Sequence, residues 1–277
     1  MGVGPAGGFG FATRSLGSEL VKAGIETTII MPQPRGFFDT ELSIDGIKVK
    51  LYPRLGLRRA FSLFKNCDAD IFHSQEPSLG TWLAQRAQPK KKHIVTCRDT
   101  RLLKDWMHEI LHPTISVLQV ALTAMYYENP FVRRAVTQSH AVLIPAHFLG
   151  ERVQKKYALK QSPQFTPTPI RIPAKTRKSD KPTVCFVGRL DRRKKPERLF
   201  KLAAAFPEVR FFVAGQAQNE AYDKKLSALF SQLPNITKVG FLDQFADQRL
   251  SNLMSESWIL VNTSHREGLP NSFLEAA

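Results

Sequence analysis

Short runs of β-branched and aromatic residues alternate with amphipathic segments along the whole chain. The first kind of segment predicts strands, and the second, with apolar residues at helical spacing, predicts helices. Strands are predicted at 27–31, 71–73, 94–97, 142–145, 184–187, 211–214, 236–239 and 258–262, and helices at 12–23, 151–157, 196–206, 222–233 and 246–255. Strands that alternate with helices form parallel sheets of βαβ units, so the sequence predicts an α/β fold.

A proline-rich, basic segment at 163–181 interrupts this alternation. Such a composition is typical of a linker between domains. The 277 residues suit two domains of ordinary size, which we place at 1–162 and 182–277. The chain opens directly in a glycine loop, without a preceding strand, and stops about one turn into a helix that begins near Asn271. We therefore expect a fragment truncated at both ends, lacking the first strand of the first domain and the last elements of the second.

The formal net charge of +16 implies an anionic partner: nucleic acid, a phospholipid surface or a phosphorylated ligand. The three cysteines, Cys67, Cys97 and Cys185, are widely spaced and indicate neither a zinc site nor a disulfide framework. Neither a secretory signal nor an apolar run long enough to span a bilayer is recognisable. We expect a cytoplasmic protein, with peripheral attachment to the inner face of the cell membrane left open.

A glycine loop, Gly7-Gly8-Phe9-Gly10, leads into the first predicted helix. Glycines let the backbone approach a ligand closely, and a helix N-terminus offers free N–H groups to an anion. The spacing does not match the dinucleotide-binding pattern GxGxxG, so a flexible terminal loop is the competing interpretation.

A basic loop follows the predicted strand at 184–187 and contains Arg189 and Lys194. Cations at the carboxyl end of a parallel strand are well placed for a diphosphate bound at the edge of an open α/β sheet. A basic loop that is merely solvated would have the same composition, and its position in the fold is what favours a binding role.

Two carboxylates, Glu267 and Glu275, lie eight positions apart around the turn Gly268-Leu269-Pro270-Asn271. The first is predicted in a loop above the strand at 258–262, and the second in the first turn of the following helix. Glu275 also has a structural interpretation, because Ser272-x-x-Glu275 matches a helix capping box.

Together these motifs resemble the family-4 retaining glycosyltransferases, which have the GT-B fold. The resemblance rests on Gly188-Arg189-Leu190 with Lys194 and on Glu267-x7-Glu275, the most specific of the motifs. Weaker matches at Gly7-Gly8, Lys22-Ala23-Gly24 and Asp70-Ile71-Phe72-His73 extend it over nearly the whole chain. It implies two Rossmann-like domains facing each other across a cleft.

The resemblance also implies roles for the residues of these motifs. Arg189 and Lys194 would hold the diphosphate of a nucleoside-diphosphate-sugar donor, and Glu275 would bind the ribose hydroxyls. Glu267 would face the transferred sugar, close to the backbone of Gly268, Leu269 and Asn271, so that the catalytic set is Arg189, Lys194 and Glu267. Gly7 and Gly8 would bring backbone near the diphosphate. The donor is then a substrate, and no separate cofactor is expected.

The chain departs from the family at Arg98-Asp99, where many members have His-Asp. An arginine does not exchange its proton near neutral pH, so no general base is predicted there. The role of Arg98 is left open, as is that of His73, which is equally interpretable as a core histidine at a strand end. Asp68-Ala69-Asp70 spells the manganese-binding DxD motif of other glycosyltransferases, but it directly precedes a strand, and we predict no catalytic metal.

The acceptor is expected to be a glycan or a lipid-linked molecule of the cell envelope. Basic clusters at 90–92 and 133–134 and the apolar stretch 110–127 favour contact with an anionic membrane surface, although a solvated basic surface would look the same. A nucleic-acid-binding protein is the alternative from another class, disfavoured because the phenylalanines are scattered over strand and helix faces. An inactive fragment of the same fold is the other alternative. The sequence does not specify the sugar or the base of the donor.

Overall fold

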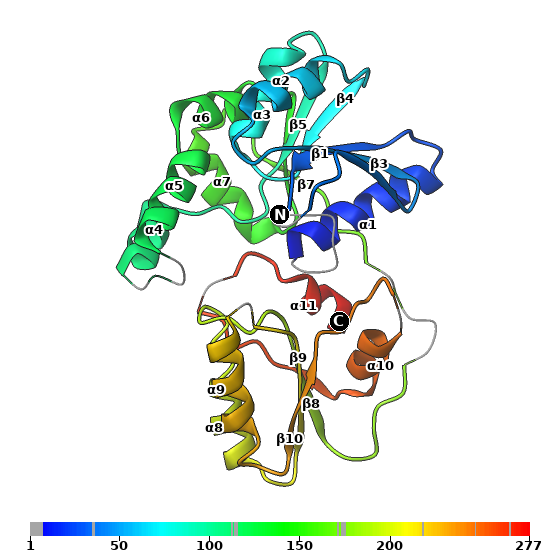
Figure 1. Cartoon of the computed structure of the whole chain (residues 1–277), viewed down its shortest axis with the longest axis vertical. Coiled ribbons are helices and arrows are strands. Elements are labelled where there is room, and N and C mark those ends of the chain that lie inside the picture. Colours follow the sequence, from blue (N-terminus) through cyan, green and yellow to red (C-terminus); the bar gives the residue numbers. More distant parts are fainter. Residues whose placement is uncertain are drawn as a thin grey trace. The chain divides into compact units, whose positions relative to one another are not determined.

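The computed structural model describes residues 8–34, 37–111, 113, 116–170, 172, 176–217, 219–246, 248–265 and 267–277. The chain forms two compact units, Phe9–Pro169 and Ile170–Ala277, and each is described separately below (Figure 1). The boundary between the units along the chain, between Pro169 and Ile170, lies within the segment 163–181 that the sequence predicts as a linker.

The first unit contains two sheets (Figure 1). In one, β1 (Thr28–Pro32) pairs in parallel with β3 (Ile47–Tyr52), and β2 (Glu41–Ile44) pairs with β3 in the antiparallel direction. In the other, four parallel strands follow the order β4 (Ile71–Ser74), β5 (Lys92–Thr96), β6 (Ala141–Ile144) and β7 (Gln164–Phe165). The carboxyl ends of this second sheet therefore lie along one edge.

The helices of the first unit connect and cover these strands. They are α1 (Gly8–Lys22), α2 (Leu57–Lys65), α3 (Leu79–Ala87), α4 (Leu103–Leu111), α5 (Val117–Tyr127), α6 (Pro130–Thr137) and α7 (Gly150–Tyr157), with a 3-10 turn at His147–Leu149. Local chemistry explains several starts: Asn129 accepts the N–H of Val132 at 3.0 Å ahead of α6, whose first residue is a proline. Helices α2 and α3 pack together over the buried Phe64 and Phe72.

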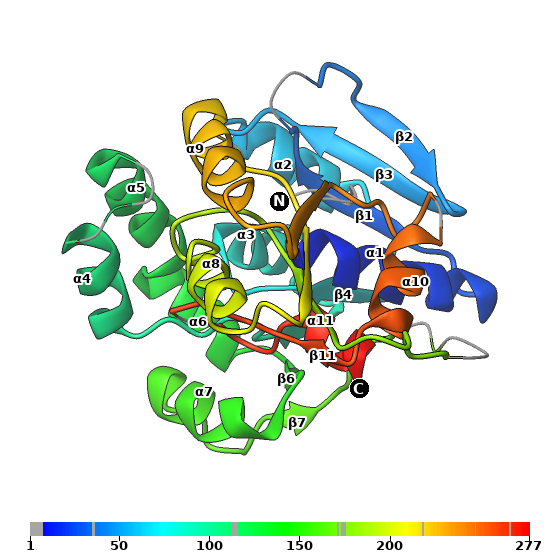
Figure 2. The same ribbon diagram turned by 90° about the horizontal axis from the view of Figure 1, so that it is seen from below.

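The second unit is a four-stranded parallel sheet in the order β10 (Ile236–Gly240), β9 (Arg210–Ala214), β8 (Thr183–Val187) and β11 (Ile259–Leu260). Its helices are α8 (Arg198–Ala205), α9 (Glu220–Phe230), α10 (Arg249–Glu256) and α11 (Asn271–Ala276). Figures 1 and 2 show α8 and α9 on one face of this sheet and α10 on the other. A parallel sheet with helices on both faces is the arrangement that alternating βα units produce.

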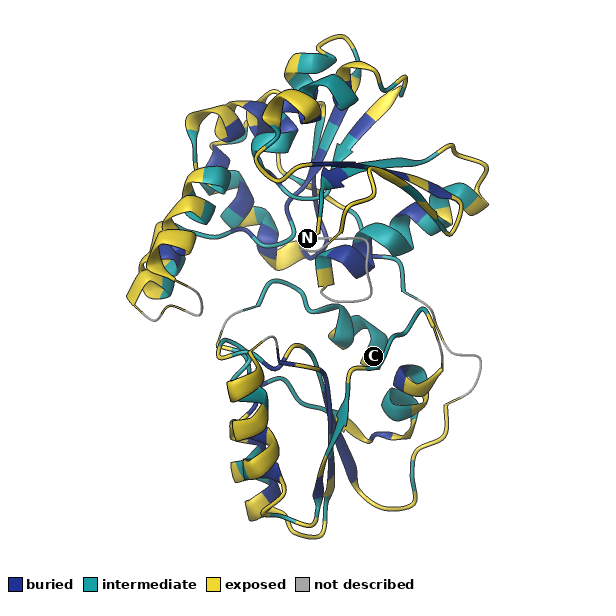
Figure 3. Ribbon diagram, in the orientation of Figure 1, coloured by how far each residue is buried: buried dark blue, intermediate teal, exposed yellow. Residues whose placement is uncertain are grey.

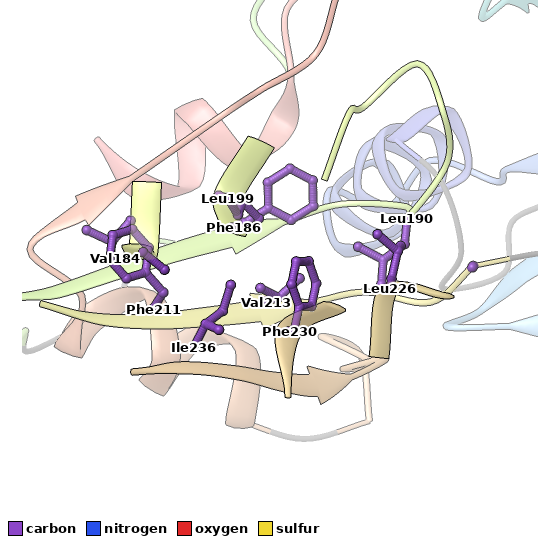
Figure 4. Packing of buried hydrophobic residues seen from close by; sticks show 11 residues of the cluster. Val184, Phe186, Leu190, Leu199, Phe211, Val213, Leu226, Phe230 and Ile236 are labelled. Atoms are coloured by element: carbon purple, nitrogen blue, oxygen red, sulfur yellow. The ribbon is translucent and has the colours of Figure 1, made fainter. Parts of the chain in front are cut away.

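The core of the second unit lies between its sheet and the pair α8 and α9 (Figure 4). Phe186 and Val213 from the strands pack in one cluster with Leu199 and Phe230 from the helices, and none of the four is more than 2% exposed. Full burial of a side chain of this size stabilises the folded state by about 2 kcal/mol. Figure 3 shows the same division in both units, with buried strands inside and exposed helix faces outside.

The α/β fold predicted from the alternation is confirmed, and each predicted strand is present with its ends shifted by a few residues. The largest difference is β11, which is two residues long where five were predicted at 258–262. The structure adds the pair β2 and β3 and the helices α2 to α6, which the sequence analysis did not identify. Strand β7 lies inside the predicted linker and extends the sheet of the first unit. Among the described residues, no helix has the length and apolar character that crossing a membrane would require.

Candidate functional site

The basic loop after β8 is held against the end of the neighbouring strand β9. Gly188 donates its N–H to the carbonyl of Ala214 at 3.0 Å, and Leu190 donates to Gln216 at 3.1 Å. Gly215 has a φ of +149°, and a Cβ at this position would lie 1.8 Å from the carbonyl oxygen of Gly188. Only glycine fits there, so the residue directly after β9 helps to fix the shape of the loop after β8.

Asp191 organises the cations of this loop. Its Oδ1 accepts the N–H groups of Arg193 at 3.0 Å and Lys194 at 3.1 Å, which closes a tight turn. Its Oδ2 lies 3.5 Å from a guanidinium nitrogen of Arg189 and 3.6 Å from one of Arg193. One carboxylate therefore gathers two arginine side chains at the carboxyl end of β8, and the side chain of Arg189 keeps 42% of its surface exposed.

The loop after β11 is fastened to the basic loop. The hydroxyl of Thr263 donates to the carbonyl of Lys194 at 2.5 Å, and the N–H of His265 donates to the carbonyl of Arg193 at 2.9 Å. The ammonium of Lys194 forms an ion pair with Glu267, and both side chains are mostly buried. Two residues that the sequence analysis assigned to one site are therefore in direct contact.

Glu275 lies in α11, and its carboxyl group has an unusual environment. Its Oε1 is buried without a hydrogen-bond partner, and burial raises its pKa to about 7. The alternative capping role is wrong, because the helix begins after Pro270, and Ser272 lies inside it rather than at its N-cap. Gly268, Leu269 and Asn271, the other predicted contacts in this region, are all partly buried. A buried carboxyl oxygen with no protein partner, on a residue that is itself only partly buried, can accept hydrogen bonds from a ligand's hydroxyl groups.

The predicted glycine contacts lie at the start of the chain. Gly8 is the first residue of α1, whereas Gly7 lies outside the described residues. The approach of their backbone to a diphosphate stays a prediction.

A second polar cluster lies at the carboxyl ends of β4 and β5 in the first unit, around Arg98. Its guanidinium donates to Thr168 Oγ1 at 2.9 Å and to Gln75 Oε1 at 2.7 Å, and its Nε is buried without a partner. The Oε2 of Glu76 accepts the backbone N–H of Arg98 at 2.8 Å and that of Asp99 at 3.3 Å. Glu76, Gln75 and Thr168 were not identified from the sequence, because they come from separate segments that only the fold brings together.

Burial keeps two side chains of this cluster, Glu76 and His73, uncharged near pH 7. It raises the pKa of Glu76 to about 8. It lowers the pKa of His73 to about 4, assisted by the nearby charge of Arg98. The Nε2 of His73 lies 2.7 Å from the hydroxyl of Thr96 on the adjacent strand. His73 is therefore an uncharged, hydrogen-bonded residue at a strand end.

The Asp68-Ala69-Asp70 sequence lies just before β4, and Asp68 is paired with Lys91 at 3.4 Å. Within the part of the chain that the structure describes, no group of three or more His, Cys, Asp or Glu side chains is arranged to hold a metal ion. Metal independence of the site stays a prediction.

Family models match the two units separately. The model described as Glycosyltransferase Family 4 matches residues 6–170, and the model described as Glycosyl transferases group 1 matches residues 169–277. The first match alone spans more than half of the chain. The chain therefore belongs to glycosyltransferase family 4, as its motifs predicted.

Solved structures with the same fold cover almost the whole chain. Sucrose-phosphate synthase from Thermosynechococcus elongatus is 17% identical with a TM-score of 0.70, covering 98% of this chain and 73% of that one. Anabaena HepE is 15% identical with a TM-score of 0.64, covering 98% of this chain and 74% of that one. The catalytic domain of starch synthase IV from Arabidopsis thaliana is 13% identical with a TM-score of 0.58. The match covers 98% of this chain and 78% of that one. A comparison with curated protein sequences finds no match. The structural likeness confirms a GT-B fold with two Rossmann-like domains.

Proposed function

We propose that the protein transfers a sugar from a nucleoside-diphosphate-sugar to an acceptor hydroxyl with retention at the anomeric carbon. The observation that carries this proposal is the joining of the loops after β8 and β11 in the second unit, where Lys194 contacts Glu267. Arg189 belongs to the same basic loop, and Glu275 offers a carboxyl oxygen without a partner. A nucleotide-sugar presents phosphates and hydroxyl groups. The cations of this site suit the phosphates, and its carboxyl groups suit the hydroxyls.

The charges of this site suit the transition state of sugar transfer. The bond between the anomeric carbon and the diphosphate oxygen breaks, and negative charge grows on the leaving diphosphate. Donors already aimed at that charge stabilise the transition state more than the ground state. Arg189 and Lys194 have this role, because Asp191 and Glu267 hold their side chains in place before the donor binds.

The remaining roles follow from the same chemistry. Glu275 accepts hydrogen bonds from the ribose hydroxyls, and Glu267 faces the transferred sugar beside the Gly268–Asn271 turn. The new bond joins the acceptor oxygen to the anomeric carbon on the face that the diphosphate leaves. The proton of the acceptor hydroxyl passes to the departing phosphate oxygen. No protein base is then required, which agrees with an arginine at position 98.

Two of the similar solved structures support the nucleotide part of the proposal. HepE was solved with UDP and glucose, and starch synthase IV with ADP and acarbose. By analogy we propose a hexosyl donor and metal-independent transfer. We further propose an acceptor in cell-envelope glycan, polysaccharide or glycolipid synthesis, a lipid-linked acceptor among them, and a place on the inner face of the cell membrane.

The test combines binding with turnover. Thermal melting with UDP, ADP and a DNA oligonucleotide should show a shift with a nucleoside diphosphate, and a shift with the oligonucleotide alone would support the nucleic-acid alternative. Arg189→Ala and Lys194→Ala should each lower turnover about a hundredfold, or roughly 3 kcal/mol, because each removes a donor from the developing charge. Lys201→Ala, an exposed charge on α8, is the matched control and should change nothing. Wild-type turnover by both site variants would refute the phosphate assignment.

A further inference from the structure

Helices α4 and α5 of the first unit form a hairpin whose outer faces are apolar. Figures 1 and 2 show it at the periphery of this unit, and Figure 3 shows most of its outer surface exposed. Each helix has a single fully buried side chain, Trp106 in α4 and Val120 in α5. The exposed large apolar side chains recur at helical spacing and range from 42% to 76% exposed: Leu103, Met107, Ile110 and Leu111 in α4, and Val117, Leu118, Leu122 and Met125 in α5.

The carboxylates of the hairpin are all engaged with partners inside the unit. Asp105 accepts the N–H of Leu102 at 2.8 Å, and Glu109 pairs with Arg101 at 3.3 Å. Glu128, just after α5, accepts hydrogen bonds from Trp106 at 3.1 Å and Lys156 at 2.5 Å. These contacts fix the inner side of the hairpin and draw negative charge away from its outer side.

The exposed residues of the two helices therefore include no acid. Besides the apolar set, the exposed residues of α4 and α5 are Lys104, His108, Gln119 and Ala121. Two more exposed cations, Arg133 and Arg134, follow on α6. Scattered apolar residues on a surface need no explanation, but eight exposed apolar residues at helical spacing on two packed helices, whose other exposed residues include no acid, need one in a chain of net charge +16.

We propose that the outer face of α4 and α5 binds the surface of an anionic lipid bilayer. Apolar side chains would enter the boundary between headgroups and acyl chains, while Lys104, Arg133 and Arg134 would meet the lipid phosphates. The helices have 9 and 11 residues, which suits helices lying in the interface. The inference rests on the membrane location proposed above, which it assigns to one face, and it is independent of the proposed donor chemistry.

Vesicle flotation of the full chain tests the apolar part. Vesicles of phosphatidylcholine mixed with phosphatidylglycerol should bind the protein at least about tenfold more tightly than vesicles of phosphatidylcholine alone, because each cation near an anionic surface strengthens the binding. The double variant Leu118→Glu, Met125→Glu should lose about tenfold or more of this binding. Both side chains are 69% exposed, so the variant is expected to fold.

The matched control is the double variant Phe38→Glu, Leu55→Glu, which makes the same charge change at two exposed apolar residues that belong to neither α4 nor α5, 89% and 94% exposed. It should bind vesicles as the wild type does, apart from a small general effect of two negative charges. Circular dichroism of both variants checks that they are folded. Equal loss of binding in both double variants, or none in either, would overturn the assignment of this face.

Two further measurements test the contribution of the cations and the possibility that another protein covers this face. Lys104→Gln with Arg133→Gln and Arg134→Gln should reduce binding to the anionic vesicles severalfold. Unchanged binding in that variant, or equal binding of the wild type to both kinds of vesicle, overturns the anionic part of the proposal. Size-exclusion chromatography that showed a dimer lost in the Leu118→Glu, Met125→Glu variant would give the face to a second copy of the chain instead.

Discussion

The two units each gather polar residues at the carboxyl ends of parallel strands, but they hold their arginines in opposite ways. In the second unit, Arg189 is 42% exposed and lies 3.5 Å from a carboxylate. In the first unit, Arg98 is partly buried and bound to the neutral side chains of Gln75 and Thr168. Within the described residues, its guanidinium has no carboxylate close enough for an ion pair.

This difference indicates which of the two arginines can exchange its protein partners for a ligand. An exposed cation in a loose ion pair exchanges its protein partner for a ligand phosphate at little cost. A partly buried guanidinium fixed by neutral hydrogen bonds cannot move without leaving its partners unpaired, which costs about 1–3 kcal/mol for each group. In the proposed function the second unit therefore presents charge to a ligand, whereas the first unit uses its charge as a fixed part of the sheet edge.

The largest expected effect is a pH dependence of stability, which arises from one buried carboxyl group in each unit. Glu76 has its pKa raised to about 8 and Glu275 to about 7, while both titrate near 4.5 when unfolded. Between those values the folded chain holds a proton that the unfolded chain has released. The free energy of unfolding therefore falls as pH rises, by up to about 1.4 kcal/mol per pH unit for each group.

Both groups contribute between about pH 5 and 7, and Glu76 alone contributes from pH 7 to 8. Hydrogen exchange measured by mass spectrometry at each pH separates peptides of the two units. Glu76→Gln should flatten the pH dependence in the first unit, and Glu275→Gln should flatten it in the second. A Glu76→Gln variant that kept the slope of the wild type would show that Glu76 is ionised when folded.

The next effect compares the two arginines directly. Arg98→Met should lower the free energy of unfolding by about 3 kcal/mol, because Gln75 and Thr168 each lose a hydrogen-bond donor. Arg189→Met, the same change at an exposed site, should alter stability by less than about 0.5 kcal/mol. Urea unfolding of both variants measures the difference, and equal losses would contradict the contrast between the two sites.

The smallest expected effect concerns the carboxylate that competes with a ligand for the cations of the second unit. Asp191→Asn keeps the oxygen that accepts the N–H groups of Arg193 and Lys194, and removes a negative charge beside Arg189. Affinity for UDP should rise about two- to fivefold at low salt. Asp243→Asn is the control, because Asp243 accepts the N–H of Phe245 in a similar turn at 2.9 Å. Calorimetric titration that found both variants equal to the wild type would exclude this competition.

The strands could be predicted because buried parallel strands are nearly continuous runs of β-branched and aromatic residues. The pair β2 and β3 was missed, although Asp45-Gly46 between alternating apolar residues is a typical hairpin turn. Both turn residues have positive φ, +52° and +78°. That sequence could have revealed the hairpin, whereas nothing local marks β7, whose two residues are strand only because β6 lies beside them.

The site could be predicted only where its residues belong to one motif. Glu267 and Glu275 share one motif and the basic loop is continuous, so Arg189, Lys194 and the two carboxylates were named together. Glu76, Gln75 and Thr168 surround Arg98 from distant segments, and their roles depend on burial that no local pattern encodes. The capping box prediction was wrong because Pro270, not Ser272, is the N-cap of α11, so the helix begins two residues earlier than the motif requires.

The contact between Gly215 and the carbonyl of Gly188 has a consequence for engineering. The loop that carries Arg189 is shaped against the end of another strand, so it cannot be grafted or lengthened as an independent module. A library that varies residues 189–195 to change donor preference should leave position 215 untouched. Conversely, any side chain introduced at position 215 would displace the loop, although it lies 26 positions after Arg189 in the chain. Such a change would alter ligand selection in the proposed site without contacting the ligand.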